Sequence, residues 1–226
     1  LRSPAAGYAG AINAESAWDY TTGENDVVVA VVDSGILPHP DLRGRLLPGY
    51  DFVSDPRYSN DGNGRDADAS DPGDYAGAGE CGAGKPATAS SWHGTHVAGI
   101  IGADGSNLYG VAGVAWKTSI LPVRVLGKCG ASSSDIADGI KWAAGLPVPG
   151  VPLNPYPARI INVSLGGLSA TGCSLVYREA IKAATIEGAL IVVAAGNAQV
   201  DVATYSPANC DGVLTVMATD RDGKLA

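Results

Sequence analysis

The sequence has little that would suit a membrane span or a nucleic-acid surface. No apolar run approaches the roughly 18 residues that a membrane-spanning helix needs. Basic residues are in the minority, with 15 Lys and Arg against 23 Asp and Glu and a formal net charge of −8. The simplest interpretation of this balance is a solvated acidic surface. The sequence therefore predicts neither a membrane nor a nucleic acid as a partner.

Cysteine is scarce, and no Cys-x-x-Cys pair is present, which disfavours a cysteine zinc site. The four cysteines are widely spaced: Cys81, Cys129, Cys173 and Cys210. An even number at wide spacing is typical of disulfides in an extracytoplasmic protein, although buried free thiols would fit a cytosolic one. Their positions alone do not choose among three pairings. The chain begins at Leu1 without an initiator Met or an apolar targeting segment, which predicts a processed, mature form.

Segments typical of buried strands alternate with segments typical of helices. Residues 27–33 (VVVAVVD) form a continuous β-branched run, as expected for a parallel strand that is buried on both faces. Further strands are predicted at 120–126, 160–165, 190–195 and 213–218, and helices from His93, at 132–144 and at 174–187. The alternation predicts an α/β fold, a doubly wound parallel sheet with helices on both faces, in one domain over residues 1–226.

Residues 51–90 are polar, acidic and rich in glycine, and they predict one long loop. A loop of this length in a compact domain is usually functional or held by ligands. Five carboxylates fall within it: Asp61, Asp66, Asp68, Asp71 and Asp74. Because calcium takes oxygen ligands from flexible loops, the spacing favours a structural calcium site, though not an EF-hand. The alternative is a mobile, solvated loop.

Three polar residues are predicted at one edge of the sheet. Asp33 ends a strand, Asn197 follows another, and His93 begins a helix. Ligands of such sheets bind beyond the carboxyl ends of the strands. Amide hydrolysis needs a base, most often His, and a carboxylate that orients it. Taken singly, Asp33 is better explained as a turn residue at the end of a strand, and His93 as a helix-capping residue.

Four segments together closely resemble the signature segments of the subtilisin-like serine peptidases of the secreted bacterial type. They are DSGI at 33–36, HGTHVAG at 93–99, NVSLGG at 162–167 and VAAGN at 193–197, in the order of the family. The resemblance implies that His93 is the general base and then the general acid, that Asp33 orients it, and that the Asn197 amide stabilises the oxyanion. It implies that an extended polypeptide substrate pairs with two backbone segments, and that Tyr205 lines the primary specificity pocket. The backbone segments are Gly130, Ala131 and Ser132 on one side and Ser164, Leu165 and Gly166 on the other.

The chain departs from the family at the segment that carries the nucleophile. The Gly-Thr-Ser-Met-Ala motif expected downstream of Asn197 is absent, and neither Ser34 nor Ser164 replaces it. We therefore expect a C-terminally incomplete catalytic domain whose serine comes from a second chain or a further segment.

The resemblance also implies how the cysteines pair and where calcium binds. It pairs Cys81 with Cys129 and Cys173 with Cys210, and it places a calcium ligand at Asp41 with Asn107 as its loop partner. The resulting prediction is a secreted serine endopeptidase that contains calcium and no redox or nucleotide cofactor. The alternatives are an inactive relative that binds peptide without cleaving it, and a calcium-dependent adhesion or scaffold domain.

Two further patterns suggest other ligands only weakly. His93 and His96 lie three residues apart on a predicted helix, a spacing that a zinc site would use, but no third ligand is near them in the sequence. Residues 77–82 match GxGxxG, yet they neither follow a strand nor open a helix, as a dinucleotide site requires.

Overall fold

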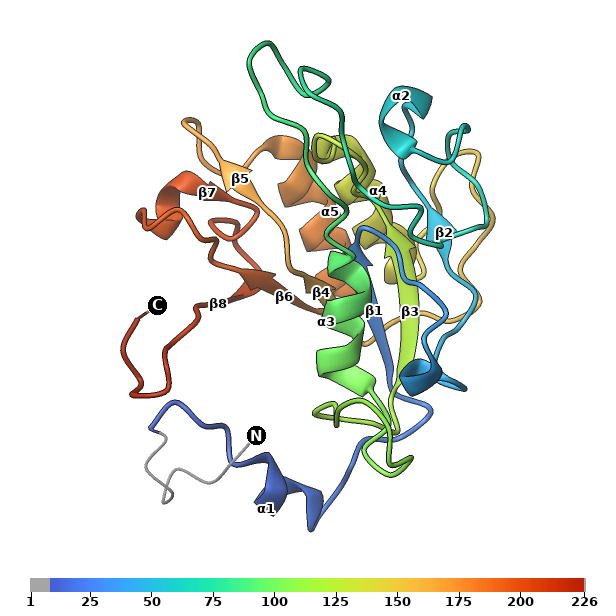
Figure 1. Ribbon diagram of the computed structural model, residues 1–226, viewed down its shortest axis with the longest axis vertical. Helices are drawn as coiled ribbons and strands as arrows, with labels where there is room; N and C mark the ends of the chain where they lie inside the picture. The colour runs from blue at the N-terminus through green and yellow to red at the C-terminus, as the bar shows by residue number, and fades with distance from the viewer. Residues whose placement is uncertain (1–8, 226) are drawn as a thin grey trace.

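A six-stranded parallel sheet organises the chain in the computed structural model, which describes residues 9–225 (Figure 1). The strand order is β2-β3-β1-β4-β6-β8. The strands are β1 (Val28–Asp33), β2 (Tyr50–Asp51), β3 (Ser119–Arg124), β4 (Ile160–Val163), β6 (Leu190–Ala194) and β8 (Val213–Val216). A separate antiparallel pair joins β5 (Gly167–Leu168) to β7 (Tyr205–Ser206).

Helices cover both faces of this sheet, which confirms the predicted fold class. Figure 1 shows α3 (His93–Gly102) in front of β1, with α4 (Ser133–Ala143) and α5 (Leu175–Ile186) behind the sheet. The short helices are α1 (Ala14–Trp18), α2 (Pro56–Ser59) and two 3-10 turns at Pro40–Leu42 and Val202–Thr204. None of the described helices has the length and apolar character needed to cross a bilayer.

Helix ends follow from serine caps that the sequence contains. Ser132 accepts a hydrogen bond from Asp135 N–H at the start of α4, and Ser174 accepts one from Tyr177 N–H at the start of α5. The predicted strands 160–165 and 213–218 were too long by two residues each, since β4 ends at Val163 and β8 at Val216. In β4 the shortening has a structural reason, because the chain then turns toward the antiparallel pair β5–β7.

One face of the sheet, called here the closed face, packs against α4 and α5. Alternate residues of neighbouring strands point toward these helices, and all of them are buried: Ala30, Val32, Ile161, Val163, Ile191 and Val193. Phe52 and Trp142 fill the space between the sheet and α4 with an edge-to-face ring contact. This face holds the main hydrophobic core.

The opposite face, called here the open face, is covered by α3 over only part of its width. Val29, Val31 and Ile120 are buried beneath α3. Further along the sheet, Val192 is paired in register with Leu214, and Ala194 with Val216. Leu214 and Val216 are 51% and 50% exposed. Apolar strand residues on this side therefore lack a covering layer within the part of the chain that the structure describes.

The long loop 51–90 is fastened to the rest of the molecule at several points. It contains α2 as well as the end of β2, so the prediction of a segment without regular structure was wrong in part. Arg124, buried at the end of β3, donates to the carboxylates of Asp51 and Asp61 and to the Ser59 carbonyl. Arg65 pairs with Asp135 and Asp138 on α4 at 2.6 and 3.0 Å.

Both disulfides form as predicted. Cys81 pairs with Cys129 and Cys173 with Cys210, each with Cα atoms 5.1 Å apart. The first bond ties the long loop to the chain that follows β3, and the second ties the start of α5 to the chain before β8.

Candidate active site

Asp33 and His93 form a hydrogen-bonded pair where β1 meets α3. The His93 Nδ1 lies 2.7 Å from Asp33 Oδ1 and 2.9 Å from Oδ2. The Asp33 side chain is 0% exposed, whereas that of His93 is 43% exposed. A buried carboxylate thus holds one ring nitrogen, and the other ring nitrogen remains available to a reactant. The predicted pairing of these residues, 60 positions apart, is confirmed.

The backbone around the pair needs glycine for two reasons. A Cβ on Gly94 would lie 2.2 Å from the Gly35 carbonyl oxygen, so α3 reaches β1 only because residue 94 has no side chain. Gly35 itself has φ +96°, the left-handed region that favours glycine. Trp92, at the N-cap of α3, also has a positive φ, of 52°. The chain is therefore turned sharply just before His93.

The Asp33 carboxylate favours the protonated form of the His93 imidazole. Its hydrogen bond raises the pKa of His93, partial burial opposes this, and the negative charges of Asp33 and Asp74 add to the increase. With Asp33 on Nδ1, the neutral ring carries its lone pair on Nε2, where it can accept a proton from a nucleophile. This arrangement suits general base catalysis.

Two carboxylates of the long loop lie at this site, which sequence reasoning did not predict. Asp71 Oδ2 accepts from Ser34 Oγ at 2.7 Å, and Ser34 Oγ accepts from Gly94 N–H at 3.0 Å. Asp74 accepts from Ser91 N–H and Oγ at 2.6 and 2.9 Å. Both carboxylates were predicted as calcium ligands. No local pattern marks their partners, which lie 37 and 17 positions away.

Asn197 lies beyond the carboxyl end of β6, three residues after that strand ends, and it is exposed. Because β1, β4 and β6 are parallel neighbours, this is the sheet edge at which β1 ends in Asp33. The structure places the predicted oxyanion donor at the same edge as the pair, with β4 between them.

The two predicted substrate-binding segments line one cavity of about 460 Å³. Gly130 and Ala131 contribute from one side, and Leu165 and Gly166 from the other. The remaining two residues have other contacts. Ser132 caps α4, and Ser164 Oγ accepts from Asn162 Nδ2 at 2.8 Å.

The Tyr205 ring lies against Gly166 and Gly196. Its hydroxyl donates to the Gly166 carbonyl at 3.0 Å. A Cβ on Gly166 or Gly196 would come within 2.7 or 2.4 Å of the ring. The ring therefore occupies space beside both the predicted cleft segment and the residue that precedes Asn197.

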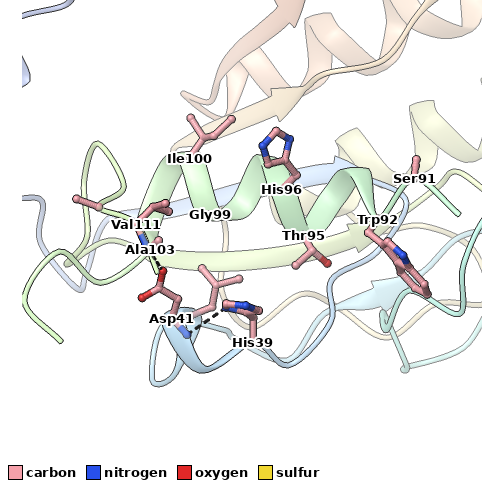
Figure 2. Close-up of a pocket in the computed structure, with 12 residues that line it drawn as sticks. His39, Asp41, Ser91, Trp92, Thr95, His96, Gly99, Ile100, Ala103 and Val111 are labelled. Carbon is pink, nitrogen blue, oxygen red and sulfur yellow. Dashed lines mark hydrogen bonds between the residues drawn. The ribbon is translucent and has the colours of Figure 1, made fainter. Parts of the chain in front are cut away.

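A second cavity, of about 620 Å³, runs along α3 on the open face and is shown in Figure 2. His39 and Asp41 lie on one side of α3, and His96 points away from them. Of the two histidines whose spacing would suit zinc, His93 and His96, the first already has its Nδ1 bonded to Asp33. Within residues 9–225, no group of three or more His, Cys, Asp or Glu side chains is arranged to hold a metal ion.

Asp41 and Asn107 are brought together as predicted. Asp41 is buried and accepts from Asn107 Nδ2 at 2.7 Å and from Val111 N–H at 2.9 Å. No described cation forms an ion pair with Asp41. Gly110 approaches so closely that a Cβ there would lie 2.2 Å from Asp41 Oδ2. A buried carboxylate with only neutral donors fits a cation, provided that the Asn107 amide turns its oxygen inward.

The loop carboxylates fit a cation less well. Asp61 pairs with Arg124, Asp66 accepts from Asn63 Nδ2 at 2.7 Å, and Asp68 accepts from Ser70 N–H at 3.0 Å. Their calcium site stays a prediction.

Comparison with known proteins gives consistent findings. The model of the family described as Peptidase_S8, subtilase family, matches residues 24–226. An extracellular protease of Xanthomonas campestris pv. campestris is 52% identical over 215 residues, which cover 95% of this chain and 37% of that protein. An extracellular basic protease of Dichelobacter nodosus is 47% identical over 220 residues, covering 95% and 36%.

A solved structure agrees closely with the fold. A protease from Pseudoalteromonas arctica superposes with a TM-score of 0.93 at 52% identity, covering 96% of this chain and 63% of that one. The chain spans little more than a third of the length of the two relatives named above.

Proposed function

This chain belongs to the subtilase family of serine proteases, and we propose that it supplies most of the catalytic domain of a secreted endopeptidase acting on extended polypeptides. The observation that carries the proposal is the hydrogen bond between buried Asp33 and half-exposed His93. The cavity between Gly130–Ala131 and Leu165–Gly166 supports an extended substrate, because backbone segments on two sides can pair with a peptide.

In the proposed mechanism, His93 Nε2 takes the proton of a serine hydroxyl as the serine oxygen bonds to the scissile carbonyl carbon. The Asn197 amide donates to the resulting oxyanion. The imidazolium then gives its proton to the leaving amine as the C–N bond breaks, and water resolves the acyl-enzyme by the same steps. Asp33 orients the ring and stabilises the imidazolium through its hydrogen bonds to Nδ1.

We propose that the serine comes from a further segment or a second chain that packs on the open face. The support is the exposed apolar surface of β6 and β8, which adjoins the face that carries α3. Burying such residues is favourable by roughly 25 cal/mol per Å² of apolar area, so this surface suits a covering layer.

Secretion and a structural calcium ion complete the proposal. Two disulfides support an oxidising compartment, and two relatives are named extracellular proteases. Asp41 and Asn107 would hold the ion, which would compensate the buried charge and stabilise the loop 104–111.

The test is labelling of the longer native protein with a serine-directed fluorophosphonate, followed by intact mass spectrometry. We expect one adduct, located on a serine outside residues 1–226, and loss of labelling in His93→Ala. The 226-residue chain alone should take no label. The alternative, an inactive peptide-binding relative, would be supported if the longer protein remained unlabelled yet bound unfolded polypeptide.

A further inference from the structure

A single buried hydroxyl connects the two segments that carry the catalytic pair. Ser34 Oγ accepts from Gly94 N–H at 3.0 Å and lies 2.7 Å from Asp71 Oδ2. Because a backbone N–H can only donate, the one hydroxyl proton of Ser34 is directed to Asp71. Ser34 follows Asp33 and Gly94 follows His93, so both bonds lie one residue from the pair.

Asp71 is itself fixed on both oxygens. It is buried, and its Oδ1 accepts from Gly73 N–H at 2.8 Å while Oδ2 accepts from Ser34. A carboxylate can accept both bonds at once, and a charged acceptor makes the bond from Ser34 stronger than a neutral one would. Asparagine at this position offers one oxygen, so either Ser34 O–H or Gly73 N–H would lose its acceptor.

The backbones at this point have no room to move independently. A Cβ on Gly35 would lie 2.8 Å from the Ala69 carbonyl oxygen and 3.0 Å from Asp71 N. A Cβ on Gly94 would lie 2.2 Å from the Gly35 carbonyl oxygen. In such close packing, a displacement of the loop at Asp71 is passed to the end of β1 and the start of α3.

We propose that Asp71 is a positioning residue for the catalytic pair, acting through the Ser34 hydroxyl to fix the start of α3, and so the His93 ring, relative to Asp33. The inference rests on the proposed function and assigns part of the acidic loop to the alignment of the base. Catalytic groups need alignment within about 0.5 Å, and a displacement of about 1 Å can cost 10²-fold in rate.

The experiment compares Asp71→Asn, Ser34→Ala, their double variant and Ser34→Thr in the longer native protein, with active sites counted by fluorophosphonate titration. We expect Asp71→Asn to lower kcat by about 10- to 100-fold, with KM within about twofold of wild type. Ser34→Ala should do the same, and the double variant should be no worse than Ser34→Ala alone, since both remove one connection.

Ser34→Thr keeps the hydroxyl and should restore kcat to within about threefold of wild type. Asp55→Asn is the matched control in the same loop, because Asp55 accepts from Arg57 N–H at the start of α2 and asparagine can do likewise. The kcat of Asp55→Asn should equal that of wild type. A purely structural role for Asp71 would lower thermal stability and leave kcat per active site intact, and that result would overturn the proposal.

A second readout needs no activity. The downfield proton resonance of His93 Nδ1–H reports its bond to Asp33 in the 226-residue chain. We expect the signal to shift or broaden in Asp71→Asn and to remain unchanged in Asp55→Asn; an unchanged signal in Asp71→Asn contradicts the inference. If the wild-type longer protein neither labels nor cleaves, the proposed function fails, whereas this measurement still decides the role of Asp71.

Discussion

The two faces of the sheet differ in how completely they are covered and in what they carry. On the closed face, strand residues such as Ile161 and Ile191 are fully buried beneath α4 and α5. On the open face, α3 covers β1 and β3 and leaves Leu214 and Val216 half exposed. Asp33 and His93 lie on the open face. The closed face therefore supplies the packing that defines the fold, while the open face carries the candidate catalytic pair and an exposed apolar surface.

The comparison is tested most strongly by matched truncations on the two faces. Ile161→Ala should cost about 3 kcal/mol of unfolding free energy in any length of protein, because it leaves a cavity in a closed core. Leu214→Ala should cost less than about 0.5 kcal/mol in the 226-residue chain and about 2 kcal/mol in the longer protein, where a covering layer would bury it. Urea unfolding measures both. Equal costs of Leu214→Ala in the two lengths would mean that nothing covers the open face.

We expect calcium binding to stabilise the elements of the open face and to leave those of the closed face unchanged. At a calcium concentration of about 100 times Kd, binding stabilises the folded state by about 2.7 kcal/mol. We expect the melting temperature to rise with calcium, and hydrogen-exchange protection to increase in α3 and residues 104–111 but not in α4 or α5. Asp41→Asn should abolish the response, and Asp19→Asn, at an exposed remote position, should retain it. A calcium response that survives Asp41→Asn would place the ion elsewhere.

Substitution of Tyr205 tests whether its ring narrows the predicted substrate cleft beside Gly166. Removing the ring in Tyr205→Gly opens the space beside Gly166 and Gly196, so cleavage after large residues should rise about tenfold in kcat/KM relative to cleavage after small ones. Tyr205→Phe keeps the ring and loses only the bond to the Gly166 carbonyl, so it should keep the original preference. Peptide-library profiling gives the comparison. An identical profile for all three proteins would remove Tyr205 from the pocket.

The smallest expected effect is in the pH dependence. Because the bond to Asp33 raises the pKa of His93, the acidic limb of kcat/KM should have its midpoint above the ordinary histidine value of about 6.5. The same shift means that His93 stabilises the fold fully below the pKa of the unfolded chain and loses that contribution as pH rises through its folded pKa. NMR titration of His93 in the 226-residue chain checks the direction. A midpoint at or below the ordinary value would show that burial outweighs the carboxylate.

The sequence predicted the closed face better than the details of the open one. The continuous apolar run at 27–33 and the alternation of strand-like and helix-like segments predicted the sheet, α4 and α5, because these patterns are local. The resemblance to a family gave Asp33, His93 and the two disulfides. The contacts of Asp71 and Asp74 could not be predicted from the sequence, because their carboxylate oxygens accept hydrogen bonds from hydroxyl and N–H groups in other parts of the chain. The same composition fits a calcium loop, and only three-dimensional contacts separate the two uses.

The half-covered sheet has a consequence for how activity would respond to cleavage of the backbone. A covering layer joined to β8 by the chain binds at an effective concentration that can reach the millimolar range. A break in the chain after β8 would turn this intramolecular packing into the association of two fragments. Specific activity would then fall on dilution below the dissociation constant of the fragments and recover on concentration. The apolar surface of β6 and β8 would make the molecule a natural split enzyme, with the base on one fragment and the nucleophile on the other.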